Sequence, residues 1–470
     1  MQIAGTLLFI LIACPALAAQ NLSLSQAMEK TLRDNREIKA SDSAVAAAKA
    51  DRDGAFAKYL PSVSVTAAYT HLNDDIEIDL HDLRSAMIAS SAASATAASG
   101  NPAVGNAVAN QLNAALPNFV LPIQKQDFTF ATVNLMQPLF TGGKITANKR
   151  AKEELYNNSQ TESTDTQGRI LVELVQQYFT VQLASKVREV RNDSLTTFKE
   201  HQRIAAALVK QGQLSRAQKM KVDVAVADAE SALSKSIRDE NLAKKVLANT
   251  LELSDTDFNL TTPLSLKPLK PMESYSSTAG NENFSLKQIH HKRSLLEAKQ
   301  TAARSEFYPT LALIGSYEFY EKDLTELAPK WFVGVALKMN IFNGGGDKSD
   351  LNVISQQKVY LDYFEGHANT LVNIGVEKYY SEILNAKEQY DTLQKTKSLA
   401  EESLRLNNSA FKNGFSKSTD VIDSELALLS VRLNELKVLY DYNSNYVQLL
   451  KFSGQKDEIV AIYKAEEKTP

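Results

Sequence analysis

The chain has 470 residues, and its 52 basic and 55 acidic side chains give a formal charge of −3. Proteins that bind nucleic acid usually carry a basic excess, so this balance argues against a nucleic-acid partner. A mean hydropathy of −0.26 excludes a bundle of membrane-spanning helices. Length alone suggests about three domains, unless internal repeats organise the chain differently.

The N-terminus is typical of a secretory signal peptide, which we predict over residues 1–18. A short apolar stretch precedes Pro15, and residues 16–18 (Ala-Leu-Ala) provide a small-x-small cleavage site. The single cysteine of the chain, Cys14, lies inside this segment. It is either removed with the signal peptide or lipidated, because residues 11–14 resemble a lipoprotein box. If it is removed, the exported chain has no disulfide and must be stabilised by packing or oligomerisation.

Two long stretches lack proline, from Leu139 to Thr262 and from Lys330 to Thr469. Since proline costs about 3 kcal/mol in a helix interior, these stretches favour long helices. Each contains a glycine in a polar setting, Gly212 and Gly414, which is typical of a turn between antiparallel helices. We predict helical hairpins over 144–251 and 347–453. Coiled-coil packing is indicated by two apolar heptad series, Ile422, Leu426, Leu429, Leu433, Leu436, Tyr440, Val447 and Leu450, and Val376, Tyr379, Ile383, Ala386, Tyr390, Leu393 and Ala400.

The two stretches are copies of one repeat. Phe140 before a glycine pair matches Phe342 before a glycine run at an offset of 202, and Gly212 and Gly414 have the same offset. Upstream, Pro61 matches Pro309 at an offset of 248, so the first copy contains 46 extra residues. We predict structural repeats over 19–251 and 284–454, an inter-repeat linker over 252–283 and a C-terminal tail over 455–470.

Each repeat also holds a pair of strand-like segments, at about 61–70 and 127–140 in the first and about 309–319 and 331–342 in the second. Apolar residues such as Val63 and Val65 alternate with polar ones, and aromatic residues lie at the segment ends. This pattern is typical of outer-membrane strands, although a soluble half-buried sheet would show the same alternation. The extra residues fall in segment 71–126, which we predict to be an exposed polar loop rather than a metal site.

Four strands do not close a barrel, because single-chain barrels begin at about eight strands. An open sheet edge is not tolerated in lipid, so a membranous sheet of this size requires oligomerisation. Residues 144–210 would form a helix about 100 Å long at 1.5 Å per residue. Such a helix is too long for a compact domain but suits a tube that crosses an aqueous compartment.

In order and spacing, these features resemble the TolC-like outer-membrane efflux protein family over about residues 22–454. The resemblance rests on the tandem repeat, on Leu24-Ser25-Gln26-Ala27 with Asn35 downstream, on Pro61 and Pro309, on segment 137–143 and on the two turn glycines. It implies a mainly α fold with a small membrane β-barrel. Three chains would form a trimeric α-helical barrel continuous with a 12-stranded β-barrel, to which each chain lends four strands. The linker 252–283 and the C-terminal tail would form a belt around the helical barrel.

The same resemblance implies a passive exit duct in the outer membrane of a Gram-negative bacterium, extending into the periplasm. The homotrimer would export small molecules or proteins together with a periplasmic adaptor (membrane fusion) protein and an energised inner-membrane pump or ABC transporter. The cargo does not follow from the sequence, because selectivity would lie mainly in the pump. A secreted or periplasmic coiled-coil scaffold or adhesion protein is the alternative.

Asp420 and Asp423 follow the second turn glycine and, at i and i+3, share one helix face. In a trimer they would place six carboxylates around one axis, which resembles the acidic constriction ring of the family and would filter cations. The first repeat has Gln218 and Lys221 at the matching positions, so only the second hairpin would contribute. Alternatively, the aspartates are ordinary acidic residues that favour a helix N-terminus.

The family docks its adaptor at the hairpin tips, which correspond here to Gly212, Gln213, Leu214, Ser215, Gly414, Phe415 and Ser416. In some relatives a tyrosine and an arginine near the second tip latch the duct shut. Here these positions are Phe411 and Ser416, so the sequence does not show which contact would hold the duct closed. Gly142, Gly143, Gly344 and Gly345 are expected to be strand-to-helix turns, because they lack the spacing of a phosphate-binding loop. With adjacent His290 and His291 facing different sides of a helix and no nucleophile–base pair, we predict no enzyme, cofactor or metal site.

Overall fold

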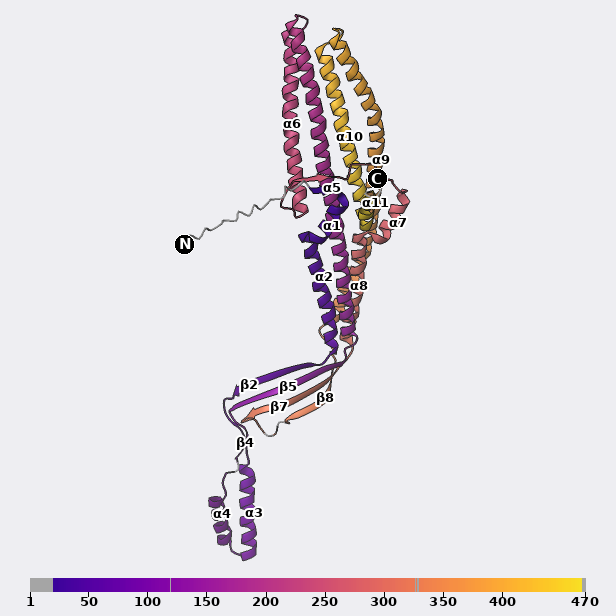
Figure 1. Ribbon diagram of the computed structural model, residues 1–470. Coiled ribbons are helices and arrows are strands. Elements are labelled where there is room, and N and C mark those ends of the chain that lie inside the picture. Colours follow the sequence, from indigo (N-terminus) through magenta and orange to yellow (C-terminus); the bar gives the residue numbers. More distant parts are fainter. Residues whose placement is uncertain (1–19, 119, 326, 328, 467–470) are drawn as a thin grey trace, which may run out of the picture. The chain divides into compact units, whose positions relative to one another are not determined.

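The structure, a computed structural model, describes residues 20–118, 120–325, 327 and 329–466. The predicted signal peptide and Cys14 therefore lie outside the described residues. The described chain is mainly helical with few strands, which confirms the predicted fold class (Figure 1). It divides into a helical unit (20–50, 153–296 and 356–466) and a strand-containing unit (51–152 and 297–355). Both units draw on both predicted repeats, so the repeats are not separate compact domains.

Two helical hairpins dominate the helical unit. The first consists of α5 (Lys144–Lys210) and α6 (Arg216–Thr250), and the second of α9 (Gly346–Lys412) and α10 (Ser418–Phe452). The paired helices have 67 and 35 residues in both copies. This equality confirms the prediction made from the shared offset of 202. Within the part of the chain that the structure describes, no helix is both long and apolar enough to cross a membrane.

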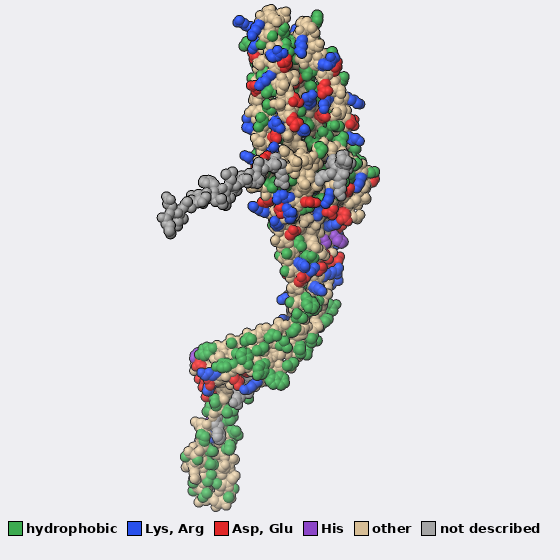
Figure 2. Space-filling model, in the orientation of Figure 1, with side chains coloured by type: hydrophobic (Ala, Val, Ile, Leu, Met, Phe, Trp, Pro, Cys, Tyr) green, Lys and Arg blue, Asp and Glu red, His purple; other side chains and the backbone are tan. Residues whose placement is uncertain are grey.

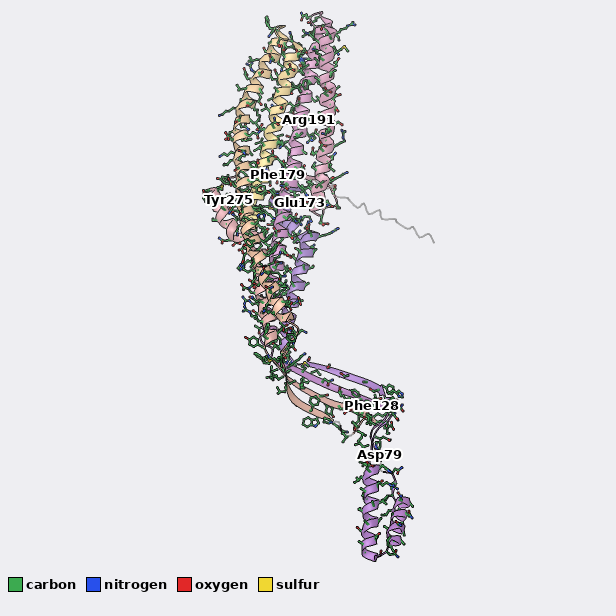
Figure 3. The ribbon with its side chains drawn as sticks, turned by 180° about the vertical axis from the view of Figure 1, so that it is seen from behind. Asp79, Phe128, Glu173, Phe179, Arg191 and Tyr275 are labelled. Atoms are coloured by element: carbon green, nitrogen blue, oxygen red, sulfur yellow. The ribbon has the colours of Figure 1, made fainter. Side chains whose placement is uncertain are left out.

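The core of the helical unit lies where both hairpins meet several shorter helices. These are α1 (Leu24–Asp34), α7 (Met272–Glu282) and α11 (Lys456–Glu466); α2 (Arg36–Gly54) and α8 (Phe284–Arg304) begin in this unit. Phe179 of α5 and Tyr275 of α7 are among its buried aromatic residues (Figure 3). The predicted tail thus contains a helix, α11, whose Ile459 and Tyr463 belong to the core.

The predicted linker is fixed to this core by backbone and tyrosine contacts. Its strand β6 (Phe258–Leu260) pairs in parallel with β1 (Gln20–Leu22). The Tyr178 hydroxyl donates to the Leu22 carbonyl at 2.9 Å and accepts the Thr262 N–H at 2.9 Å. The Tyr446 hydroxyl donates to the Pro268 carbonyl at 3.2 Å, and burial raises its pKa. The proline-rich segment is therefore held at several points.

The predicted heptad seam of α10 is correct in one half and wrong in the other. Val447 and Leu450 are buried as predicted, but towards the hairpin tip the buried residues are Val421, Ser424, Glu425 and Leu428. Leu426, predicted to lie in the seam, is 49% exposed. The buried face near the tip includes polar side chains. One of them, Ser424, accepts a hydrogen bond from the Asn407 amide of α9 at 2.6 Å, which allows it to be buried. A pattern of apolar residues alone does not predict that polar residues are buried in a helix–helix contact.

The strand-containing unit is built on a four-stranded antiparallel sheet in the order β2-β5-β7-β8. The strands are β2 (Ser62–His71), β5 (Asp127–Phe140), β7 (Thr310–Lys322) and β8 (Trp331–Lys338), and short 3-10 helices, Ala55–Tyr59 and Ser305–Phe307, precede β2 and β7. The prediction that the last strand reaches residue 342 is wrong, because β8 ends at Lys338. β8 is an edge strand whose pairing with β7 stops at Lys338, whereas β5, paired on both sides, continues to Phe140.

Segment 71–126, predicted to be a polar loop, contains regular structure instead. Strands β3 (Ile76–Asp79) and β4 (Val120–Gln124) form a ribbon that carries a hairpin of α3 (His81–Ser99) and α4 (Pro102–Ala115). The alanine-rich composition is the physical reason, since alanine is the strongest helix former. Asn101 caps α4 by accepting the Ala103 N–H at 2.9 Å, and proline occupies the first helical position.

Candidate channel-forming surfaces

One face of the four-stranded sheet is apolar and exposed. Val63, Leu135, Gly315 and Val333 are partners in register across all four strands, so they form one row on one face. The two valines at the ends of this row are each 66% exposed. Hydrophobic side chains accordingly gather over the sheet in Figure 2. An exposed apolar sheet face of this kind suits contact with lipid.

The opposite face of the sheet carries a polar row among apolar side chains. In the next row in register, Ser64, Asn134 and Ser316 are followed by Phe332 on the edge strand β8. Asn134 donates to the Thr66 hydroxyl at 3.2 Å and accepts from the Ser316 hydroxyl at 3.0 Å. The sheet therefore combines an apolar face with an opposite face that holds a hydrogen-bonded polar row, and the wall of a membrane barrel around an aqueous lumen likewise has an apolar outer and a polar inner side.

Exposed aromatic residues lie at both ends of the sheet. At one end Trp331 is the register partner of Tyr317, and both are exposed. At the other end Phe140 and Tyr308 are exposed. Aromatic residues at the two borders of an apolar band are typical of strands that end at the two membrane interfaces.

Both edges of the sheet are open, since β2 bonds only to β5 and β8 only to β7 among the described strands. An open edge leaves a row of backbone N–H and C=O groups without strand partners. In a membrane each such group would cost several kcal/mol. The sheet of one chain therefore requires neighbouring strands from other copies if it enters lipid.

The two hairpin tips close with the same backbone geometry. Gly212 and Gly414 have φ angles of 74° and 77°, a conformation that favours glycine. Immediately after them, the Gln213 N–H donates to the Leu208 carbonyl at 2.9 Å, and the Phe415 N–H donates to the Ala410 carbonyl at 2.8 Å. These paired bonds close the C-terminus of each long helix before the chain reverses.

The side chains of the two tips differ. Phe415, at the position of Gln213 in the first tip, is 88% exposed. After the first tip the Ser215 hydroxyl caps α6 by accepting the Gln218 N–H at 3.3 Å. The tips border a hollow of about 900 Å³ that is lined by Leu208, Gln213, Leu214, Phe411, Phe415, Ser416 and Asp420, among others. Large aromatic side chains in pockets are enriched among the residues that dominate protein–protein interfaces.

Asp420 helps to close the N-terminus of its own helix. Its carboxylate accepts the Lys417 N–H and the Ser416 hydroxyl, each at 2.9 Å. The Lys417 N–H, and then the Ser416 hydroxyl, hold the pKa of this carboxyl below its usual range. Asp420 thus makes the contact expected of an ordinary acidic residue at a helix N-terminus, which was the alternative to a constriction ring.

Asp423 lies in a different environment. It is exposed and borders a groove of about 390 Å³ between α6 and α10, together with Ile422, Leu426 and, from α6, Val224 and Lys221. Within one chain the two predicted constriction residues therefore line separate hollows. The groove is also lined by Ile422, Leu426 and Leu429, which the heptad prediction assigned to the coiled-coil seam.

A buried contact near the tips was not predicted. His201 of α5 places Nε2 2.8 Å from the hydroxyl of Ser418, the first residue of α10, and its ring centre lies 4.6 Å from that of Phe411. Burial lowers the pKa of the histidine. The contact joins the two hairpins, and Phe411 belongs to it. No local pattern reveals this contact, because its polar partners are 217 positions apart.

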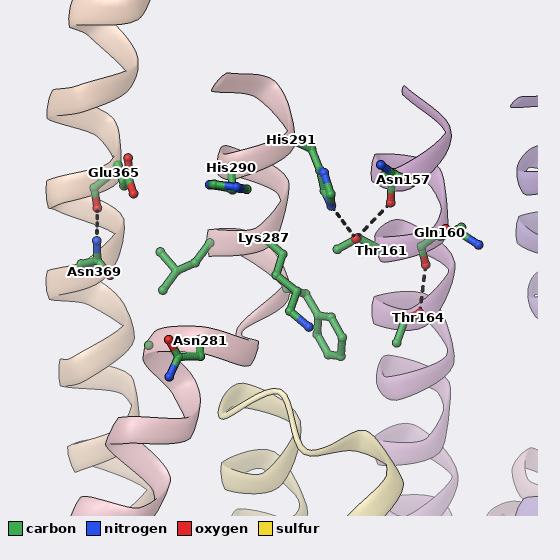
Figure 4. Close-up of a pocket in the computed structure, with 13 residues that line it drawn as sticks. Asn157, Gln160, Thr161, Thr164, Asn281, Lys287, His290, His291, Glu365 and Asn369 are labelled. Carbon is green, nitrogen blue, oxygen red and sulfur yellow. Dashed lines mark hydrogen bonds between the residues drawn. The ribbon is translucent and has the colours of Figure 1, made fainter. Parts of the chain in front are cut away.

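A polar cavity of about 670 Å³ lies between α5, α8 and α9 (Figure 4). In Figure 4, His290 and His291 point in different directions, as expected for neighbours on a helix. His291 Nδ1 lies 3.1 Å from a Glu154 carboxylate oxygen, and Nε2 lies 3.3 Å from the Thr161 hydroxyl. Among the described residues, no group of histidine, cysteine or acidic side chains is arranged to hold a metal ion.

The four turn glycines all have positive φ angles, between 61° and 89°. They do not have the same surroundings. A Cβ at Gly142 would lie 2.9 Å from the Ser305 carbonyl oxygen, whereas a Cβ at Gly344, the matching position, would meet nothing within 4 Å. The first turn is therefore both conformationally restricted and closely packed.

The profile of the outer membrane efflux protein family matches residues 275–455. The outer-membrane protein VceC of Vibrio cholerae superposes with a TM-score of 0.72 at 13% identity, covering 92% of this chain and 96% of that one. The outer-membrane channel OprN gives 0.72 at 14% identity, with 92% and 90% covered. The open-state MtrE channel of Neisseria gonorrhoeae gives 0.70 at 16% identity, with 92% and 88% covered. No curated protein matches significantly.

Proposed function

We propose that this chain, whose residues 275–455 match the profile of the outer membrane efflux protein family, belongs to that family and forms an exit duct in the outer membrane as a homotrimer. The family resemblance predicted from the sequence is thereby confirmed. The duct is passive and needs no catalytic group. It carries small molecules or proteins outward, driven by a separate energised transporter.

The observation that carries the proposal is the two-faced sheet with two open edges. Three copies would supply twelve strands, with β8 of one chain pairing with β2 of the next. The apolar row through Val63 and Val333 would then face lipid, and the polar row through Asn134 would face the lumen. Closure removes every open edge, which a membrane demands.

The helical unit also has surfaces that need neighbours. Exposed large apolar side chains recur along α6 and α9, where a soluble monomer would normally place polar residues. Packing of neighbouring copies into a helical barrel would cover them. They include Met220, Val224, Leu242, Tyr360, Tyr363, Leu371, Ile374 and Leu399.

The hairpin tips are the proposed docking surface for a periplasmic adaptor protein, which connects the duct to an inner-membrane pump or ABC transporter. Two features support this assignment. Phe415 projects from the second tip, and the groove between α6 and α10 presents Ile422 and Leu426 near it. Gly212 and Gly414 keep the turns tight, which allows a partner helix to approach closely.

Docking is tested by cysteine crosslinking to a co-expressed adaptor. Ser215→Cys and Ser416→Cys place the thiol at each tip, and Ser231→Cys places a matched thiol on an exposed position of α6 away from the tips. We expect adducts from the tip variants and none from the control. The absence of adducts from every tip position would count against docking.

Asp420 and Asp423 are proposed to form the constriction of the duct. Both follow the second tip, and three copies would bring six carboxylates around the axis. A ring of carboxylates favours cations and repels anions.

The proposed function as a whole is tested on the full chain. Outer membranes should yield a heat-modifiable trimer, and the purified trimer should conduct ions in a planar bilayer. A soluble secreted product that forms no channels would overturn the proposal and support the scaffold instead.

A further inference from the structure

Apart from the first four residues of α3, 81–84, the hairpin of α3 and α4 belongs to a segment without charge. From Ser85 to Gln124 no acidic, basic or histidine side chain occurs, although 23% of the whole chain is charged. On the face drawn in Figure 2 the hairpin is green and tan. An exposed helical surface normally carries charged residues, so their absence over forty consecutive positions calls for a physical reason.

Arg84, the cation that directly precedes this segment, is used inside the hairpin. Its guanidinium donates to the Asn113 carbonyl at 2.8 Å and to the Leu116 carbonyl at 3.0 Å, and the residue is 8% exposed. It therefore caps the C-terminus of α4. The surface between the two ends of the hairpin is left uncharged.

The two helices contact each other closely but bury little. A Cβ at Gly105 of α4 would lie 1.9 Å from the Thr96 hydroxyl of α3, so the glycine permits this approach. Within α3 and α4, only Arg84, Ile88 and Gly105 are buried, while Leu83, Met87 and Val104 are exposed. Helices this short are marginal in water without tertiary packing. The hairpin thus has apolar surface that remains to be covered.

The charge pattern distinguishes between possible occupants. Helices that lie on membranes carry lysine and arginine on a polar face, and this hairpin presents none. A charged partner protein would find no complementary charge. Symmetry-related copies, in contrast, bring identical residues together, where charges of one sign would repel each other and small uncharged residues pack closely.

We propose that the α3–α4 hairpins of neighbouring copies pack against one another as an outer helical cluster, so that the occupant of this surface is a second copy of this chain. The inference rests on the proposed trimer. In that assembly the β3–β4 ribbon, which extends β2 and β5, starts beside the open edge of β2 where the next chain is expected. The cluster covers the exposed Leu83, Met87 and Val104.

Single cysteines on the hairpin test the contact directly. Exposed positions around both helices are replaced one at a time, as Ser90→Cys, Ala93→Cys, Ala97→Cys, Asn106→Cys and Asn110→Cys. Oxidation in intact outer membranes should link two chains at one or more of these positions, and Ser231→Cys on α6 serves as the control. Trimers that form normally but crosslink at none of the five positions overturn the inference.

A charge swap provides a second, independent measurement. Ala93→Glu with Ala97→Glu adds like charges to one flank of α3, while Ala93→Gln with Ala97→Gln adds the same bulk without charge. We expect the glutamate trimer to dissociate at a lower temperature than the glutamine trimer. Co-expression with an Ala93→Lys, Ala97→Lys chain should raise that temperature again, because opposite charges then face each other. Equal dissociation temperatures for both variants contradict the cluster, whereas a wild-type chain that forms no trimer contradicts the proposed function itself.

Discussion

His201 Nε2 lies 2.8 Å from the Ser418 hydroxyl, and this buried contact joins α5 of the first hairpin to the start of α10 in the second. Because the imidazole is buried, its pKa is lowered and the neutral form is preferred. The unfolded or locally opened chain binds a proton at the ordinary histidine pKa of about 6.5. The contact therefore stabilises the tip fully above this pH and loses its contribution as the pH falls below it.

We predict that His201→Ala weakens the tips by about 1–3 kcal/mol, since it leaves the buried Ser418 hydroxyl without its partner. His201→Gln, which keeps a polar group but does not titrate, should lose less and should remove the pH dependence. Hydrogen exchange of amides in 411–421 measures the effect at pH 8 and pH 5.5. Tips that exchange equally in wild type and His201→Ala would show that the contact contributes nothing.

Replacing Asp420 and replacing Asp423 should affect the conductance alike but the stability of α10 differently. Asp423→Asn removes an exposed charge without a backbone contact in the structure, so we expect higher single-channel conductance and weaker block by multivalent cations. Asp420→Asn should have the same electrical effect while retaining an acceptor for the Lys417 N–H. Asp420→Ala should in addition loosen the start of α10, detected as faster hydrogen exchange there.

The pH dependence of cation selectivity adds a further check on Asp420. Its lowered pKa means that the carboxylate stays ionised when the pH falls through the range where ordinary aspartates protonate. Cation selectivity that depends on Asp420 should therefore persist at about pH 3.9, where an ordinary aspartate is half protonated. Unchanged conductance and block in the double alanine variant would remove both residues from the constriction.

The strand-to-helix turns allow a matched comparison between repeats. Gly142→Ala and Gly344→Ala both impose a left-handed conformation on alanine, which costs about 1–2 kcal/mol. Only Gly142→Ala also brings a Cβ to 2.9 Å from the Ser305 carbonyl oxygen. We predict that Gly142→Ala lowers the yield of heat-resistant trimer more than Gly344→Ala does, measured by denaturing electrophoresis without heating. An equal or reversed order would contradict the packing at Gly142.

The two faces of the sheet predict opposite outcomes for neighbouring residues. Val65 lies on the apolar face and Thr66 on the polar face, where Asn134 bonds to it. Val65→Arg should cost about 2–4 kcal/mol on a lipid face at mid-depth and should reduce insertion into outer membranes. Thr66→Arg should insert normally and alter conductance instead. Equal membrane yields for the two variants would contradict the assigned faces.

Features fixed by local chemistry were predictable from the sequence. The paired turn glycines and their offset of 202 gave the two hairpins with equal helix lengths, because a positive φ and a proline-free stretch are properties of the local chain. Alternation gave the strands for the same reason. The α3–α4 hairpin was misread because serine- and alanine-rich sequence suits a loop as well as a helix.

Features that depend on distant partners were not predictable. His201 and Ser418 are far apart in sequence, and neither lies in a recognisable motif. The apolar periodicity of Ile422 and Leu426 is real, but periodicity does not state whether a stripe faces its own chain or a neighbour. The role of Asp420 and Asp423 in a constriction stays a prediction, and the bond from the Lys417 N–H to Asp420 depends on the exact geometry of the turn.

The early end of β8 at Lys338 has a consequence for biogenesis. The last described strand ends opposite Thr310, the first residue of its one partner, β7, and both outer strands leave an edge of the sheet that can accept a wrong partner. In the proposed trimer, completion of the sheet requires strands from other chains, which would make the final step of folding dependent on concentration. Such a chain would need protection from premature pairing until the trimer forms.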